Sequence, residues 1–426
     1  MKHKVLITAL IIILTGVFVG NWVYGTVLSK KIEKQLISLF QTVDAKHQLE
    51  FNKVKVNPLL SKLQIKGFTI STLQGQEVIS GQELILDMPY SEVMRLLNDK
   101  KVEELKSLKL KVADLSVYVE GANDSLLVNQ LLIDFDGHLL KADIENIQNQ
   151  FPESKQELML QAKGLRFAQT PWMNNLGFTE DQIKEFNWVE ELKVDLSFNP
   201  NKQEFKVADL HMLSPLMNCV SEGTVKYAGN GLANVKTTSV NSAFKLELNN
   251  NGIEWGDPST TGRFAIDKLM IDTESAVSYA GSSPVIQSQA SDVLLENFSV
   301  EFSGDKKAQL EASAALLGLK LDKVNIKRLS IQSNMENNAF VIKNTELKSS
   351  LLNAELDARI QMNEQAPGAS QIEYGTLIIS DLVPGLQNAL STFELVTGQS
   401  LPRKGKAIVL EMSGAVSRPN IKGLKY

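Results

Sequence analysis

Residues 192–198 read Leu-Lys-Val-Asp-Leu-Ser-Phe, and this alternation decides the fold class. An apolar residue at every second position is typical of a β-strand with one buried face and one wet face. The same alternation returns at 244–248 and 356–362 and dominates the chain beyond about residue 48. The sequence therefore predicts a mainly β fold, an elongated, twisted antiparallel sheet with a few short helices. It leaves open whether this sheet forms an open groove or a closed sandwich.

A second pattern brackets two mostly polar residues between two apolar ones, and a further apolar residue follows two positions on. In a plain strand the bracket would send the later apolar residues to the other face. One inserted residue, as in a β-bulge, would return them to the first face. We therefore predict a bulged structural repeat, with chance recurrence of a loose pattern as the alternative. The six copies begin at Ile65, Val112, Val207, Ile266, Leu295 and Ile326.

Helical signals are few. Thr179 before Glu180 is a favourable helix start. Leu386, Leu390 and Phe393 share one helical face after Pro384. We therefore expect short helices at these two places.

The N-terminal segment 1–28 is predicted to be a transmembrane anchor. Residues 5–28 are almost entirely apolar, and a helix of this length spans about 36 Å, enough to cross a hydrocarbon core. Trp22 and Tyr24 stand where an interfacial aromatic belt would lie. A cleaved signal peptide is the alternative, since Lys2 and Lys4 give a basic start. The short N-terminal tail favours export of everything that follows.

Beyond the anchor, the sequence divides into two further parts. Residues 29–47 carry apolar side chains at helical spacing among Lys, Glu and Gln, which predicts an amphipathic helix beside the membrane. Residues 48–426 form the predicted periplasmic β-rich domain. A glycine- and asparagine-rich stretch near 249–262 marks a candidate joint within this domain.

Composition excludes several function classes. Of 426 residues, 43% are hydrophobic and 22% charged, which is ordinary for a folded protein. The net charge of -5 gives no electrostatic reason to bind nucleic acid. Cys219, the single cysteine, cannot form a disulfide within the chain. Motifs for phosphate binding, nucleophilic hydrolysis or zinc catalysis are missing from the sequence, so we expect no cofactor and no enzyme.

One short stretch could hold a divalent cation. Asp134, Asp136 and His138 place two carboxylates and an imidazole at close spacing. They follow an apolar run and surround Gly137, however, which is typical of the end of a strand with solvated aspartates. We favour that interpretation over a metal site.

Two stretches carry a family resemblance. Residues 54–70, read with the anchor, and the tail 414–421 resemble the AsmA-like family of envelope proteins. The anchor with Trp22, Tyr24 and Gly25 is also similar to the YdgA-like proteins, and the N component of type II secretion is a third relative in style. The resemblance implies a chain anchored by one helix in the bacterial inner membrane, with a large periplasmic domain of twisted sheet.

The same resemblance implies a role in cell-envelope maintenance, in which membrane lipid is held or moved in an apolar β-groove. The alternative is a non-enzymatic scaffold that binds protein partners in an envelope or secretion complex, through sheet edges or the C-terminal tail. A lipid groove would use inward apolar positions of the repeat. The candidates are Phe68, Leu115, Leu210, Phe298 and Leu329.

Overall fold

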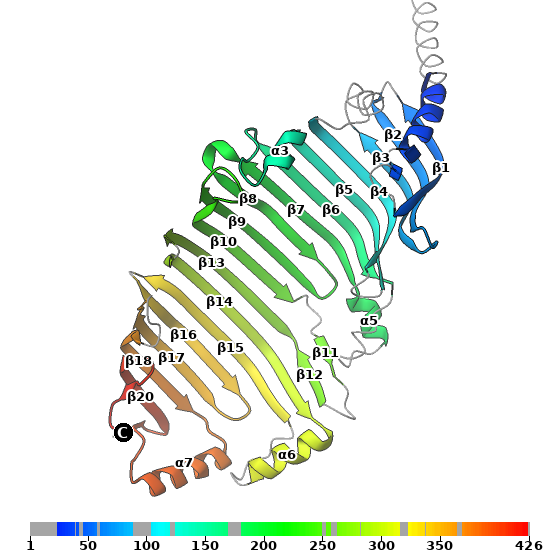
Figure 1. The fold of residues 1–426 in the computed structure, drawn as a ribbon. Coiled ribbons are helices and arrows are strands. Elements are labelled where there is room, and N and C mark those ends of the chain that lie inside the picture. Colours follow the sequence, from blue (N-terminus) through cyan, green and yellow to red (C-terminus); the bar gives the residue numbers. More distant parts are fainter. Residues whose placement is uncertain are drawn as a thin grey trace, which may run out of the picture. The chain divides into compact units, whose positions relative to one another are not determined.

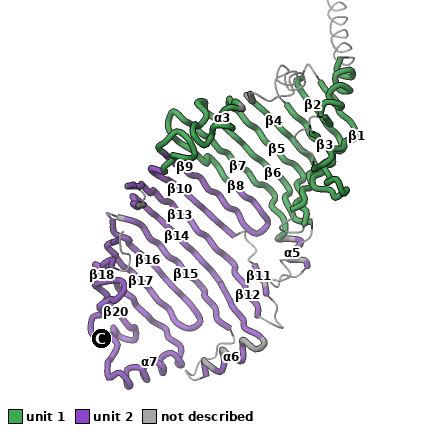
Figure 2. The backbone as a smooth tube through the Cα atoms, in the orientation of Figure 1, with its two compact units in different colours: residues 1–170, 187–210, 228–236 green, residues 171–186, 211–227, 237–426 purple. Residues whose placement is uncertain are grey.

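A computed structural model of the chain describes residues 24–38, 40–41, 46–57, 60–87, 104–119, 124–168, 180–248, 253–256, 262–281, 283–315, 323–336, 338–363 and 369–424. The chain divides into two compact units, shown in Figure 2. Unit 1 comprises residues 1–170, 187–210 and 228–236, and unit 2 comprises 171–186, 211–227 and 237–426.

The fold is mainly β, as predicted. In the described part of the chain, 21 strands belong to one mostly antiparallel sheet, so no second sheet forms the sandwich that the sequence left open. In unit 1, consecutive strands pair from the first to the seventh (Figure 1). These strands are β1 (His47–Asn57), β2 (Lys62–Thr72), β3 (Glu77–Asp87), β4 (Glu104–Val119), β5 (Asp124–Leu140), β6 (Gln156–Phe167) and β7 (Trp188–Asn199).

Unit 2 repeats this arrangement with strands that also pair in chain order from β13 to β18, after which β18 pairs with β20. Strand β8 (Glu204–Leu213) lies mostly in unit 1. The strands of unit 2 are β9 (Met217–Ala228), β10 (Lys236–Leu248), β11 (Ile253–Trp255), β12 (Gly262–Ile266), β13 (Lys268–Ala280), β14 (Ser283–Phe302), β15 (Lys323–Glu336), β16 (Ala339–Ser349), β17 (Asn353–Gln361), β18 (Gln371–Ser380), β19 (Arg403–Lys404), β20 (Ala407–Ala415) and β21 (Asn420–Ile421).

Short helices connect these strands. They are α3 (Lys141–Asn146), α5 (Glu180–Phe186), α6 (Gly304–Ala315) and α7 (Pro384–Thr397), with a 3-10 turn at Pro200–Lys202. The helices predicted after Thr179 and Pro384 are confirmed as α5 and α7. The sequence did not predict α6, whose apolar residues are mostly alanines.

An N-terminal helix covers residues 24–38 and 40–41 and packs on the sheet of unit 1. Leu28 and Ile32 are buried with Val54, Leu63 and other strand residues in one hydrophobic core cluster. The hydroxyl of Ser29 also accepts a hydrogen bond of 3.0 Å from the backbone N–H of Val56 in β1. The residues predicted to form a juxtamembrane helix are therefore partly built into the first unit.

The bracket pattern returns its apolar residues to one face, because Leu63, Ile65 and Phe68 all lie in that core cluster. The mechanism differs from the predicted bulge. Gly67, inside the β2 bracket, has a left-handed backbone (φ 56°), yet the register of β2 with β1 is the same before and after it. In each strand, therefore, the alternation between the two faces shifts by one residue at the same position across the sheet. We call this shift a change of phase, and it needs no inserted residue.

This change of phase runs across unit 1 as a row of unpaired positions that we call the phase row. The registers place it at Asn52, Gly67, Gln82, Asp114, Asn129, Gly164 and Glu190, one position in each of β1 to β7. The left-handed residues are Gly67, Asp114 and Gly164, which stand in alternate strands. A Cβ on Gly67 would lie 2.1 Å from the amide nitrogen of Asn52, and one on Gly164 would lie 2.4 Å from that of Asn129.

Unit 2 contains both arrangements. Asn297 in β14 is left-handed, and its side-chain amide donates a 2.8 Å hydrogen bond to Asp267, with the register on both sides unchanged. In β15, by contrast, Lys327 is an extra residue relative to β16, because the register shifts between Ile326 and Arg328. The predicted bulge is thus confirmed at the Ile326 bracket and wrong at those of Ile65, Val112 and Leu295.

Part of the predicted N-terminal architecture lies outside the described residues, which begin at Tyr24. Among the residues that are described, no helix combines the length and the apolar character needed to cross a bilayer. The candidate joint near 249–262 lies within unit 2, and residues 249–252 and 257–261 of it are also outside the described part.

Candidate functional site

One face of the sheet in unit 1 is apolar from strand to strand, and we call it the apolar face of unit 1. Plain alternation places these side chains on one side of each strand, and the constant register aligns them into rows. Three rows cross β4 to β7: Leu110, Ile133, Leu160 and Val194; Val112, Leu131, Ala162 and Leu192; and Leu115, Val128, Leu165 and Val189.

Unit 2 has an equivalent apolar face, built by the same alternation in its own strands. Its longest row crosses seven strands from β13 to β20. This row consists of Leu269, Leu295, Leu329, Leu347, Ala354, Ile379 and Ile408. A second row crosses β10, β13, β14 and β15 at Leu246, Ile271, Val293 and Ile331.

Most side chains of these faces are only partly buried. In unit 1 the N-terminal helix covers residues of β1, β2 and β4, whereas Ile133, Leu160 and Val194 keep part of their surface exposed. In unit 2, Leu295 and Leu329 are likewise partly exposed. An apolar surface of this kind favours a partner that removes it from water, since each buried methylene contributes about 0.8 kcal/mol.

The opposite face carries charged pairs, both within a strand and between neighbouring strands. The ammonium of Lys193 lies 2.8 Å from Asp195 and 3.0 Å from Asp209. Its hydrogen bonds to these two carboxylates raise the pKa of Lys193 to about 12. In unit 2, Arg328 lies 2.8 Å from Glu296 and 3.5 Å from Glu346. The two faces of each unit are therefore chemically distinct.

Two hollows in unit 1 lie mainly on its charged face. The larger, about 800 Å³, is lined by acidic residues such as Asp136 and Glu157 together with Lys155 and Lys206. The smaller, about 340 Å³, includes Lys111 and Gln130. Charges of both signs alternate along these walls, which gives neither hollow the single-sign field that concentrates a charged ligand.

The metal candidates Asp134, Asp136 and His138 lie within β5, which continues to Leu140, so the strand end predicted around Gly137 is wrong. Asp134 pairs with Lys109 of β4, and Asp136 lies two residues further along the same strand face. The carbonyl of His138 accepts hydrogen bonds from Ser154 and Gln156. Within the described ranges, His, Cys, Asp and Glu side chains form no group of three that could hold a metal ion.

The five lipid-facing candidates fall in different environments. Phe68 is buried in the core cluster, with its ring over Gly81, and Leu115 packs against the same cluster. Leu210 lies in β8 and is partly buried. Phe298 pairs with Ile326, and Leu329 belongs to the long apolar row of unit 2. Their role in lipid binding stays a prediction.

Sequence reasoning singled out too few residues of the apolar faces. Ile133, Leu160 and Val194 belong to them as fully as Leu115 does, although Leu160 lies outside any bracket pattern. The signal that could have found them is ordinary alternation in β5, β6 and β7.

Comparisons with known proteins identify no relative. Searches against family models, curated proteins and solved structures give no match to the chain.

Proposed function

We propose that the chain is a membrane-anchored, non-enzymatic protein of the bacterial cell envelope that holds or transfers lipid against the apolar faces of its sheet. One observation carries this proposal: in each unit, apolar side chains form unbroken rows across four to seven strands, and many of them are partly exposed. The resemblance to AsmA-like proteins and the apolar segment 5–28 support the same assignment, with the large domain in the periplasm.

Physical chemistry explains how such a face would act. An acyl chain laid along a row exchanges contact with water for contact with Leu, Ile and Val side chains, while its polar head group stays in solvent. Single residues contribute little, so affinity is spread over the face. No covalent step and no cofactor is involved.

Photo-crosslinking in a living Gram-negative host tests this proposal. A photo-reactive amino acid replaces Leu160 or Leu329 on the apolar faces, and, as matched controls, Gln161 or Ser330, the next residues along the same strands. After irradiation the full chain is purified under denaturing conditions and adducts are identified by mass spectrometry.

The proposal expects phospholipid adducts at Leu160 and Leu329 that are several-fold more abundant than at Gln161 and Ser330. With the photo-reactive residue at Leu295, the neighbour of Leu329 in the same row, lipid adducts should fall when Phe298 and Leu329 are both replaced by Asp, whereas the Leu160 adduct should persist in that variant. Equal labelling of both faces, or adducts with proteins alone, would contradict lipid binding and favour the scaffold function instead.

A further inference from the structure

The last turn of α7 exposes three large apolar side chains. Leu395 is 83% exposed, Val396 79% and Phe393 48%. The helix ends at Gly398, whose left-handed backbone (φ 67°) closes it immediately after these residues. A soluble surface has little reason to gather such side chains at one helix end, so this end, which we call the α7 tip, fits a binding surface.

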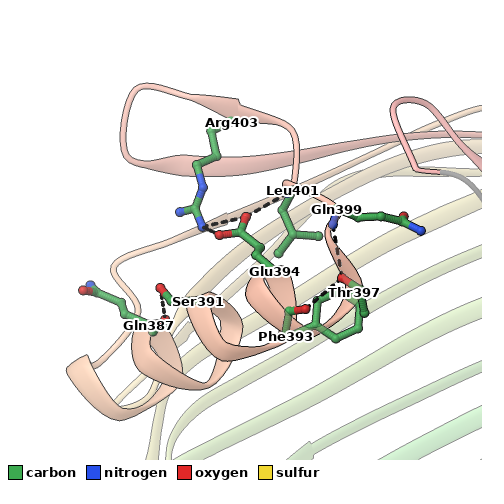
Figure 3. A network of polar contacts seen from close by, with 8 residues as sticks. All are labelled: Gln387, Ser391, Phe393, Glu394, Thr397, Gln399, Leu401 and Arg403. Carbon is green, nitrogen blue, oxygen red and sulfur yellow. Dashed lines mark hydrogen bonds and ion pairs between the residues drawn. The ribbon is translucent and has the colours of Figure 1, made fainter.

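Hydrogen bonds hold the α7 tip in place, as Figure 3 shows. Glu394 accepts a 2.7 Å hydrogen bond from the backbone N–H of Leu401 and two of 3.1 Å from Arg403. The hydroxyl of Thr397 donates to the carbonyl of Phe393 at 2.8 Å. The side chains of Glu394 and Thr397 therefore have partners within the unit, which lowers the cost of moving the tip out of water.

Exposed lysines stand near the tip. Glu394 is the single charged residue between 382 and 402, and Arg403 neutralises it. The contact between them places the hairpin of β19 and β20 beside the helix end. This hairpin exposes Lys404 and Lys406. The surface thus combines exposed apolar side chains with two exposed lysines, although the whole chain has a net charge of -5.

We propose that the α7 tip binds the surface of an anionic phospholipid bilayer. Leu395, Val396 and Phe393 would enter the boundary between head groups and acyl chains, while Lys404 and Lys406 lie against anionic head groups. This contact is separate from the apolar faces of the sheet, and neither depends on the other. It gives the protein a second attachment to membrane, through an element remote in sequence from the predicted anchor.

Flotation of the full chain tests this contact. The chain is reconstituted in nanodiscs of phosphatidylcholine, which accommodate its apolar N-terminus, and mixed with vesicles of phosphatidylcholine with or without phosphatidylglycerol. Discs carrying the wild-type chain should float with the anionic vesicles. Lys404→Gln with Lys406→Gln should lower this binding about 25-fold, at about fivefold for each lysine near the surface. Leu395→Ser with Val396→Ser should lower it at least tenfold.

Two matched variants serve as controls, Val416→Ser for an exposed apolar residue and Lys268→Gln for an exposed lysine of the same unit, and both should bind like the wild type. An environment-sensitive dye on Leu395→Cys should brighten with anionic vesicles, whereas the same dye on Val416→Cys should not. The proposal is overturned if wild-type discs do not float, if the tip variants bind like the controls, or if a photo-crosslinker at Leu395 captures only protein in cells.

Discussion

Replacing Ile32 by Ala should strongly destabilise unit 1, because this side chain joins the N-terminal helix to the sheet. Ile32 is 0% exposed and packs in one cluster with Leu28, Val54 and Leu63. The substitution removes three buried carbons, which at about 0.8 kcal/mol each amounts to about 2.4 kcal/mol. The cavity left behind adds about 1 kcal/mol, so we expect a loss of about 3 to 4 kcal/mol.

Hydrogen exchange of the full chain measures this loss where it should occur. The amide of Val56 is a suitable reporter, because it donates to Ser29 of the helix and is protected only while the helix is docked. Val27→Ala is the matched control, since Val27 lies on the same helix but is 65% exposed. That variant should change the opening free energy by less than about 0.5 kcal/mol.

Equal effects of Ile32→Ala and Val27→Ala on the exchange of Val56 would contradict this prediction. Such a result would mean that the helix does not contribute to the stability of the unit, and that residues 29–47 act only as a connection to the anchor. A loss confined to Ile32→Ala would instead show that the N-terminal helix forms part of the core of unit 1.

Three further predictions follow from local features. Gly67→Ala should lower the free energy of unfolding in urea by about 3 kcal/mol, because of left-handed strain and the clash with Asn52. Gly75→Ala, which is also left-handed but has open space around it, should lower it by only about 1 kcal/mol. Similar losses at both sites would argue against the phase row. Hydrogen bonds to Asp195 and Asp209 raise the pKa of Lys193 from 10.5 to about 12, so this lysine should stabilise the fold fully below about pH 10.5 and lose that contribution as the pH rises through 12. The difference in unfolding free energy between wild type and Lys193→Gln should therefore shrink over that pH window. A difference that stays constant to pH 12 would contradict the pairing. Burial raises the pKa of the Cys219 thiol, so a disulfide reagent at pH 8 should modify it slowly in the folded chain and rapidly in urea; fast modification of the folded chain would show that this thiol is accessible.

The sequence predicted the strands well because their signal is local. The alternation at 192–198, 244–248 and 356–362 lies in β7, in β10, and in β17 with the residue that follows it. It also predicted that bracketed residues such as Ile65 and Phe68 share a face. Each of these inferences needs only the period of side-chain direction along one strand.

The phase row could not be predicted in the same way, because it depends on pairing between strands. A bracket at Ile65 is compatible with one inserted residue or with a matching change of phase in β1 and β3. Only the registers of β2 with its neighbours distinguish the two. The docking of the helix on β1 also depends on contacts between distant residues, and helical spacing alone fits a membrane surface equally well.

Gly67, Asp114 and Gly164 imply a rule for how such a sheet can change in length. Each stands in the second strand of a pair, β1 with β2, β3 with β4, and β5 with β6, and the residue at the same level of the first strand does not have a positive φ. Removal or duplication of a single strand would break this alternation. Two neighbouring strands would then both have a left-handed residue at this level, or both would lack one. Gain or loss of a whole pair of strands keeps the left-handed positions in alternate strands. Such a sheet can therefore change in length by two strands at a time.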